Sequence, residues 1–190
     1  MKAMMFVLLM SVLLAGCFSS SVRYYALQDG QASALLSNTH PPAHRVGVSV
    51  VTLPKLLNRP QLVVRLSDSE LKFEEQHQWG GRLQEEISQV LTTALQSLHP
   101  QDAVYLYPAD NRTMPNQQWS ADILQLDGML GGVVTLQANC RLLDKSSRLP
   151  VFERSVQHKI QTKGYEISDY INAQRDLLKT LAAACSWDSL

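Results

Sequence analysis

The sequence has no excess of charge of either sign, because 17 Lys and Arg residues balance 17 Asp and Glu residues. Proteins that coat DNA or RNA need many basic side chains against phosphates, so the balance argues against a nucleic-acid partner. Three cysteines are too few for a disulfide-rich scaffold. No apolar run reaches the roughly 20 residues that suit a transmembrane helix. With 190 residues, 45% of them hydrophobic, the chain is expected to form one globular domain.

The sequence also lacks the spacings that mark common catalytic and metal sites. No two histidines stand at the spacing of a zinc protease, and no Cys-x-x-Cys pair occurs. The Gly-x-Ser-x-Gly turn of many hydrolases is missing as well. We therefore expect a protein without enzymatic activity, metal or bound cofactor, with a hydrolase of unrecognised site as an alternative. The five histidines are interpreted as isolated surface residues: His40, His44, His77, His99 and His158.

What the sequence does have is an unusual beginning. Thirteen of its first 16 residues are apolar, and Lys2 is the only charge before Arg23. A basic start, a short apolar run and a small-residue exit are typical of a secretory signal peptide. Residues 1–16 are therefore predicted to be a signal peptide that is removed.

The exit of this segment reads Leu14-Ala15-Gly16-Cys17, which matches the bacterial lipoprotein box. In that interpretation cleavage precedes Cys17, whose sulfur then carries diacylglycerol and whose amino group carries an N-acyl chain such as palmitate. Multiple acyl chains give stable anchoring where one chain would not. Phe18 and Ser19 follow instead of Asp, which favours the outer membrane. The alternative is an ordinary signal peptide with a chance cysteine.

The predicted boundaries follow from this interpretation: a signal peptide at 1–16, a lipidated tether at 17–22 and a single periplasmic domain at 23–190. Extended chain spans about 3.5 Å per residue, so the tether holds the domain within roughly 20–25 Å of its membrane. A partner from the other membrane must therefore reach the domain.

Hydrophobic periodicity predicts a layered α/β domain with a mixed sheet. Residues 83–98 carry an apolar stripe at helical spacing. A second helix is predicted at 168–185, with Ser168 as its cap. Residues 119–126 and 133–142 flank a glycine-rich turn and are expected to form an antiparallel hairpin. Further strands are predicted at 23–27, 45–53, 61–66, 70–74, 104–107 and 151–161.

Cys140 and Cys185 are both predicted to face inward, one from a strand and one from the last helix. In an oxidising periplasm they could form a disulfide. The alternative is a pair of buried free thiols, since sequence does not give the distance between them.

Several stretches carry a family resemblance. They are Tyr24-Tyr25-Ala26-Leu27, Val46 to Pro54, Leu57 to Val63, Trp79 to Leu83 and Gly131 to Ala138. In their order and spacing the sequence resembles the ABC-type transport auxiliary lipoprotein family, which includes the lipoprotein of the paraquat-inducible system. The resemblance implies a three-layer α/β sandwich and a non-enzymatic subunit. Relatives partner mammalian-cell-entry (MCE) proteins, which form hollow periplasmic conduits for lipid between the membranes.

The resemblance further implies a role in docking a conduit at the outer membrane and supporting envelope integrity, with a homo-oligomeric ring as the expected assembly. Candidate contact loops are Leu56–Pro60 and Asp127–Gly132, and candidate motif residues are Arg59, Pro60 and Trp79. The structural alternative is that Arg59 satisfies turn carbonyls and Trp79 packs the helix start. The alternative function is a structural envelope lipoprotein that binds peptidoglycan or another outer-membrane assembly.

Overall fold

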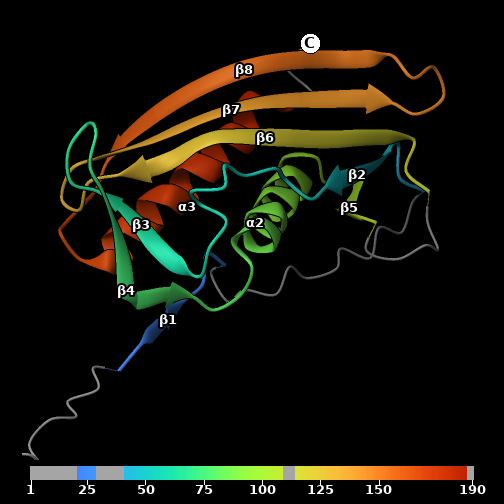
Figure 1. The fold of residues 1–190 in the computed structure, drawn as a ribbon. Coiled ribbons are helices and arrows are strands. Elements are labelled where there is room, and N and C mark those ends of the chain that lie inside the picture. Colours follow the sequence, from blue (N-terminus) through green and yellow to red (C-terminus); the bar gives the residue numbers. More distant parts are fainter. Residues whose placement is uncertain (1–20, 29–40, 109–113, 188–190) are drawn as a thin grey trace, which may run out of the picture.

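The fold is seen in a computed structural model, which describes residues 21–28, 41–108 and 114–187 (Figure 1). Within these residues two helices pack against two mixed sheets, so the predicted α/β class is confirmed. The helices are α2 (Leu83–Leu98) and α3 (Ile167–Ala184). The strands are β1 (Arg23–Tyr25), β2 (Arg45–Ser49), β3 (Gln61–Arg65), β4 (Leu71–Trp79), β5 (Ala103–Tyr107), β6 (Gln117–Gly128), β7 (Val133–Asp144) and β8 (Pro150–Gln161).

The larger sheet has five strands in the order β5-β2-β6-β7-β8. Its first two pairings are parallel and its last two antiparallel, which confirms the mixed sheet and the predicted hairpin. Alternate residues of β7 turn toward the helices, as period-two patterning requires. The residues on this face are almost completely buried: Val134, Leu136, Ala138, Cys140 and Leu142.

A smaller sheet has the order β1-β4-β3. The strands predicted at 61–66 and 70–74 correspond to β3 and β4, which pair antiparallel, and β1 joins β4 in parallel. The division of the strands between two sheets was not predicted, because hydrophobic patterns identify strands without identifying their partners. All three central residues of β3 are buried, since this edge strand of the small sheet is in contact with β6 of the larger sheet.

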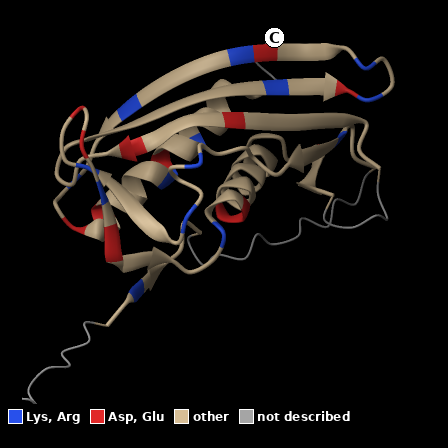
Figure 2. Cartoon of the chain, in the orientation of Figure 1, with Lys and Arg blue, Asp and Glu red and all other residues tan. Residues whose placement is uncertain are grey.

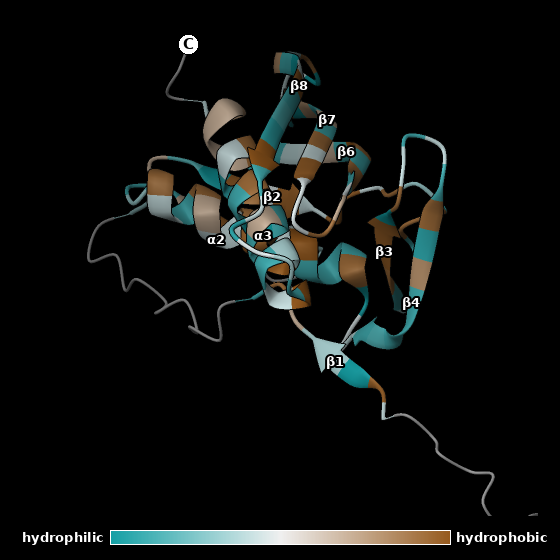
Figure 3. Cartoon of the chain, turned by 90° about the vertical axis from the view of Figure 1, so that its left-hand side faces the viewer, coloured by the Kyte–Doolittle hydropathy of each residue, from teal (hydrophilic) through white to brown (hydrophobic). Residues whose placement is uncertain are grey.

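Both helices lie on one side of the five-stranded sheet, and β1 lies beyond them (Figures 1 and 3). The predicted stripe of α2 is buried, with Ile87, Leu91 and Leu95 fully covered. The cap predicted for α3 is wrong. Glu166 precedes the first helical residue, and Ser168 falls within the first turn without a capping bond.

Basic and acidic residues are interspersed along the strands, helices and loops in the view of Figure 2. Among residues 21–28, 41–108 and 114–187, neither helix combines the length and hydropathy of a membrane span. Residues 1–16 and Cys17 lie outside the described part of the chain.

Candidate docking groove

The two predicted contact loops meet at one hollow of the surface. Leu56 from the first loop and Asp127, Gly128 and Met129 from the second line a cavity of about 700 Å³. The rest of its lining comes from the end of β3, from Asp68 in the turn after it, and from the outer face of β6, β7 and β8. We call this hollow the β3–β6 groove. It is open to solvent and large enough for a segment of another molecule.

An ion pair holds the two sides of the groove together. Arg65 on β3 donates through Nε and Nη2 to the two carboxylate oxygens of Asp127 on β6, each at 3.0 Å. The Asp127 side chain is only 4% exposed, and Gln125 adds a third donor at 2.9 Å. The hydrogen bond with Asp127 raises the pKa of Arg65. Such two-pronged pairing fixes orientation as well as distance, so the groove is preformed. Sequence reasoning missed this pair, because residues 65 and 127 belong to different predicted elements.

A β-bulge turns an apolar side chain into the groove. β6 pairs Ile123 with Ala138 and then Gln125 with Gln137, so Leu124 is an extra residue on its strand. Its side chain is 48% exposed. Bulges commonly re-aim a side chain next to a functional site. The adjacent apolar residues Ile123 and Leu124 break the strand's alternation, which is the one sequence signal that could have revealed the bulge. Exposed Met129 and Val133 extend the apolar lining.

The turn that ends the groove depends on glycine. Gly131 has φ +67°, and a Cβ at this position would collide with the ring of Tyr165. Residues other than glycine are strained in this region of backbone space. The interpretation of this segment as a hairpin turn is therefore confirmed.

Arg59 and Pro60 lie outside the lining of the groove. The Arg59 guanidinium carbon lies 3.8 Å from the ring centroid of Phe73, so this cation stacks on an aromatic face. Its Nε is buried and has no hydrogen-bond partner among the described residues. The main contact of Arg59 is therefore with the ring of Phe73, and not with turn carbonyls as in the structural alternative. Pro60 accepts a 2.8 Å hydrogen bond from the main chain of Trp79.

Trp79 is a core residue in this structure. Its side chain is buried at the end of β4, where it is in register with Tyr25 of β1. An indole in this position packs the approach to α2 and is not presented to a partner.

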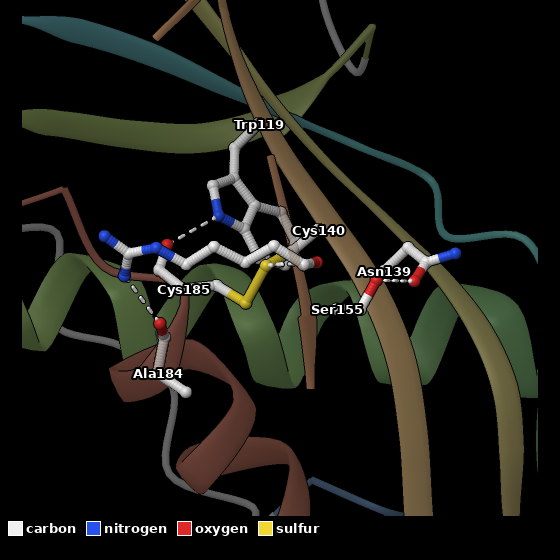
Figure 4. Close-up of a disulfide and its surroundings, with 7 residues drawn as sticks. Trp119, Asn139, Cys140, Ser155, Ala184 and Cys185 are labelled. Carbon is white, nitrogen blue, oxygen red and sulfur yellow. Dashed lines mark hydrogen bonds between the residues drawn. A yellow bond between two sulfur atoms is a disulfide. The ribbon is translucent and has the colours of Figure 1, made fainter. Parts of the chain in front are cut away.

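The sulfur atoms of Cys140 and Cys185 are joined in a disulfide that links β7 to the end of α3 (Figure 4). The two Cα atoms are 6.3 Å apart, within the usual range for such bonds. Trp119 donates from its indole nitrogen to the Cys185 oxygen at 3.1 Å. The pair is buried, so its position favours a structural role.

His40 lies outside the described residues, and among the four described histidines His99 departs from the surface interpretation. His99 is fully buried after α2, where its ring stacks on Trp187 at 3.6 Å between centroids. Its Nε2 lies 2.9 Å from the Ser186 hydroxyl oxygen. The nearby Asp102 carboxylate accepts a hydrogen bond of 3.0 Å from the indole nitrogen Nε1 of Trp187. His99 was not recognised as a core residue because its stacking partner is 88 residues away.

This serine–histidine pair does not make a hydrolytic site. Both residues are buried, and a nucleophile needs access to substrate. Across the described residues no group of three or more His, Cys, Asp or Glu side chains is arranged to hold a metal ion. The contacts of His99 and Asp102 with Ser186 and Trp187 instead link the residues after α3 to the turn between α2 and β5.

Comparison with known proteins identifies the family. The model of the ABC-type transport auxiliary lipoprotein component family matches residues 25–185. A search of the curated proteins finds no match. The crystal structure of an uncharacterized protein is similar over 90% of this chain and 100% of its own, with a TM-score of 0.71 and 14% identity. A protein from Xanthomonas campestris is similar over 74% of this chain and 80% of its own, with a TM-score of 0.61 and 14% identity. At this identity the likeness shows the fold alone.

Proposed function

Because this chain belongs to the ABC-type transport auxiliary lipoprotein component family, we propose that it is a non-enzymatic subunit of an MCE-type lipid transport system. It docks a periplasmic conduit at the outer membrane and supports envelope integrity. The observation that carries the docking role is the β3–β6 groove, where both predicted contact loops come together. Its preformed walls and its exposed apolar side chains, which stand among polar ones, suit a protein partner.

The proposed anchor is Cys17, with diacylglycerol on its sulfur and an acyl chain on its nitrogen. Signal-peptide features upstream and the small residues before Cys17 support this assignment. Replacing Cys17 with Ala should release the protein from membranes. Continued sedimentation of this variant with the outer membrane would contradict the anchor.

The groove is tested with a charge placed on its apolar wall. Leu124→Asp should weaken capture of the MCE protein from detergent extracts, because it puts a carboxylate where apolar surface is expected to be buried. Leu149→Asp is the matched control, since Leu149 is 65% exposed on the turn between β7 and β8 and does not line the groove. Circular dichroism and thermal unfolding should show that both variants fold.

Three outcomes are informative. If Leu124→Asp no longer captures the MCE protein while Leu149→Asp still does, the result supports the groove as the docking site. Equal capture by both variants contradicts the groove while leaving the partner in place. If the unchanged protein captures peptidoglycan and no MCE protein, the structural envelope role replaces the proposed one.

Assembly is a separate part of the proposal. A homo-oligomeric ring would match the hollow end of a conduit, and closed rotational symmetry is the usual form of soluble oligomers. Native mass spectrometry of the detergent-solubilised protein tests it, with a single closed stoichiometry expected.

A further inference from the structure

The first strand presents exposed apolar surface where the chain comes from its proposed anchor. Tyr24 on β1 is 68% exposed, and Val22, which directly precedes β1, is 40% exposed. They are two residues apart, so in an extended chain their side chains point to the same side. Neither is explained by the core or by the β3–β6 groove. We propose that this face of β1 is a second membrane contact, which fixes the orientation of the domain on its bilayer. The proposal rests on the lipid anchor at Cys17.

β1 is attached firmly enough to transmit such an orientation. Its three residues pair in parallel with the end of β4. The Tyr25 oxygen accepts from the Gly80 nitrogen at 2.8 Å, and the Tyr25 hydroxyl lies 2.8 Å from His77 Nδ1. The point where the tether meets the domain is therefore part of the fold.

The next residues add a second attachment. The Leu27 nitrogen donates to Glu86 on α2 at 2.6 Å. Its oxygen accepts from Arg175 on α3 at 2.5 Å. Leu27 is fully buried between these partners. A membrane contact at β1 is thereby coupled to both helices.

The chemistry of the face fits the interface between lipid and water. Tyr24 is seven residues after Cys17, so fully extended chain places it no more than about 25 Å from the acylated residue. Tyrosine is enriched at membrane interfaces because its ring is apolar and its hydroxyl is polar. Arg23, which stands between Val22 and Tyr24, points to the opposite side of the chain by the same alternation, so the proposed contact consists of Val22 and Tyr24 alone.

The contact has a consequence for docking. In both views of the ribbon the helices lie between β1 and the strands β6 to β8 (Figures 1 and 3). With β1 on the bilayer, the outer face of β6, β7 and β8 points away from it. This face supplies much of the β3–β6 groove, which would then be open to a conduit that arrives from the periplasm.

The test places a tryptophan at the contact. Acylated Tyr24→Trp protein is reconstituted into vesicles of phosphatidylethanolamine and phosphatidylglycerol with brominated acyl chains. Acylated Leu149→Trp is the matched control, because its turn lies at the opposite corner of the molecule (Figure 1). Emission of the unchanged protein is subtracted, since three tryptophans are already present. We expect brominated chains to quench the added tryptophan at position 24 and leave the one at position 149 unquenched.

Equal quenching at the two positions, or none at position 24, overturns the β1 contact. Mass analysis and vesicle flotation separate this failure from failure of the anchor. If Cys17 is acylated and the protein floats with the vesicles, an unquenched position 24 overturns only the contact. If Cys17 is unmodified, the proposed lipid anchor is wrong, and the proposed orientation of the domain on the bilayer is wrong as well.

Discussion

The hydroxyl of Tyr170 donates a hydrogen bond of 2.8 Å to the main-chain oxygen of Val63. The same hydroxyl accepts from the Gly128 nitrogen at 3.2 Å. Tyr170 is fully buried, and this burial raises its pKa. One side chain on α3 therefore joins β3 to the end of β6, two of the strands that line the β3–β6 groove.

Replacing Tyr170 with Phe is expected to lower the free energy of unfolding by about 1–3 kcal/mol, because buried main-chain groups lose a partner. Urea unfolding followed by fluorescence measures the change. Tyr165→Phe is the control: its side chain is exposed, and surface substitutions usually change stability by less than about 0.5 kcal/mol. Equal midpoints for the two variants would show that the buried hydroxyl contributes nothing.

The pair Arg65 and Asp127 gives a second prediction. Asp127→Ala should cost about 2 kcal/mol of stability, since it removes hydrogen bonds to a charged partner. The double variant Arg65→Met with Asp127→Leu should cost less than Asp127→Ala alone, because it leaves no uncompensated charge. A double-mutant cycle in urea measures the coupling, with Arg65→Met and Asp127→Leu made singly and together. Additive effects of the two sites would contradict the proposed role of the pair in holding the groove.

Some of this architecture could be predicted from the sequence because it rests on local periodicity. The stripe of α2 and the alternation of β7 each have one dominant period, and both were predicted correctly. The hairpin was predictable because its two arms flank turn glycines. These elements identify the layers of the fold.

The candidate groove was only half predictable. Its loops were chosen as contact candidates, but Arg65 and Asp127 are 62 positions apart, and no local rule pairs them. The bulge at Leu124 depends on the register of β6 against β7. Likewise, the burial of His99 depends on Trp187 from the far end of the described chain. Each of these features is set by tertiary contacts.

Asp144 gives a prediction about pH. Its carboxylate accepts from the hydroxyl of Ser146 at 2.6 Å and from the Ser147 nitrogen at 2.8 Å. These bonds, with that of Ser146 the largest cause, lower its pKa from 3.8 to about 2. Carbon-13 NMR of the carboxyl group should find this lowered value. An ordinary pKa would contradict the hydrogen-bonded turn between β7 and β8.

The sign of the effect on stability follows from the lowered pKa. A carboxylate that ionises more readily when folded contributes stability above its unfolded pKa of about 4 and loses it as the pH falls toward about 2. Between these values the unchanged protein should lose more stability than Asp144→Asn, which has no charge to lose. If the free energy of unfolding falls equally steeply with pH in the two proteins, groups other than Asp144 cause the loss of stability in acid.

The disulfide gives the largest expected change in stability. Cys140 and Cys185 are 45 positions apart, and the loop-entropy model assigns a bond closing a loop of this size about 4 kcal/mol. The double variant Cys140→Ser, Cys185→Ser should therefore unfold at a much lower urea concentration than the oxidised protein. A reducing agent should lower the urea midpoint of the oxidised protein toward that of the variant and leave the midpoint of the variant unchanged. Mass mapping under non-reducing conditions checks the bond itself. Two free thiols in protein isolated from an oxidising compartment would contradict it, and the variant's loss of stability would then reflect only the packing of two buried side chains against Trp119 and α3.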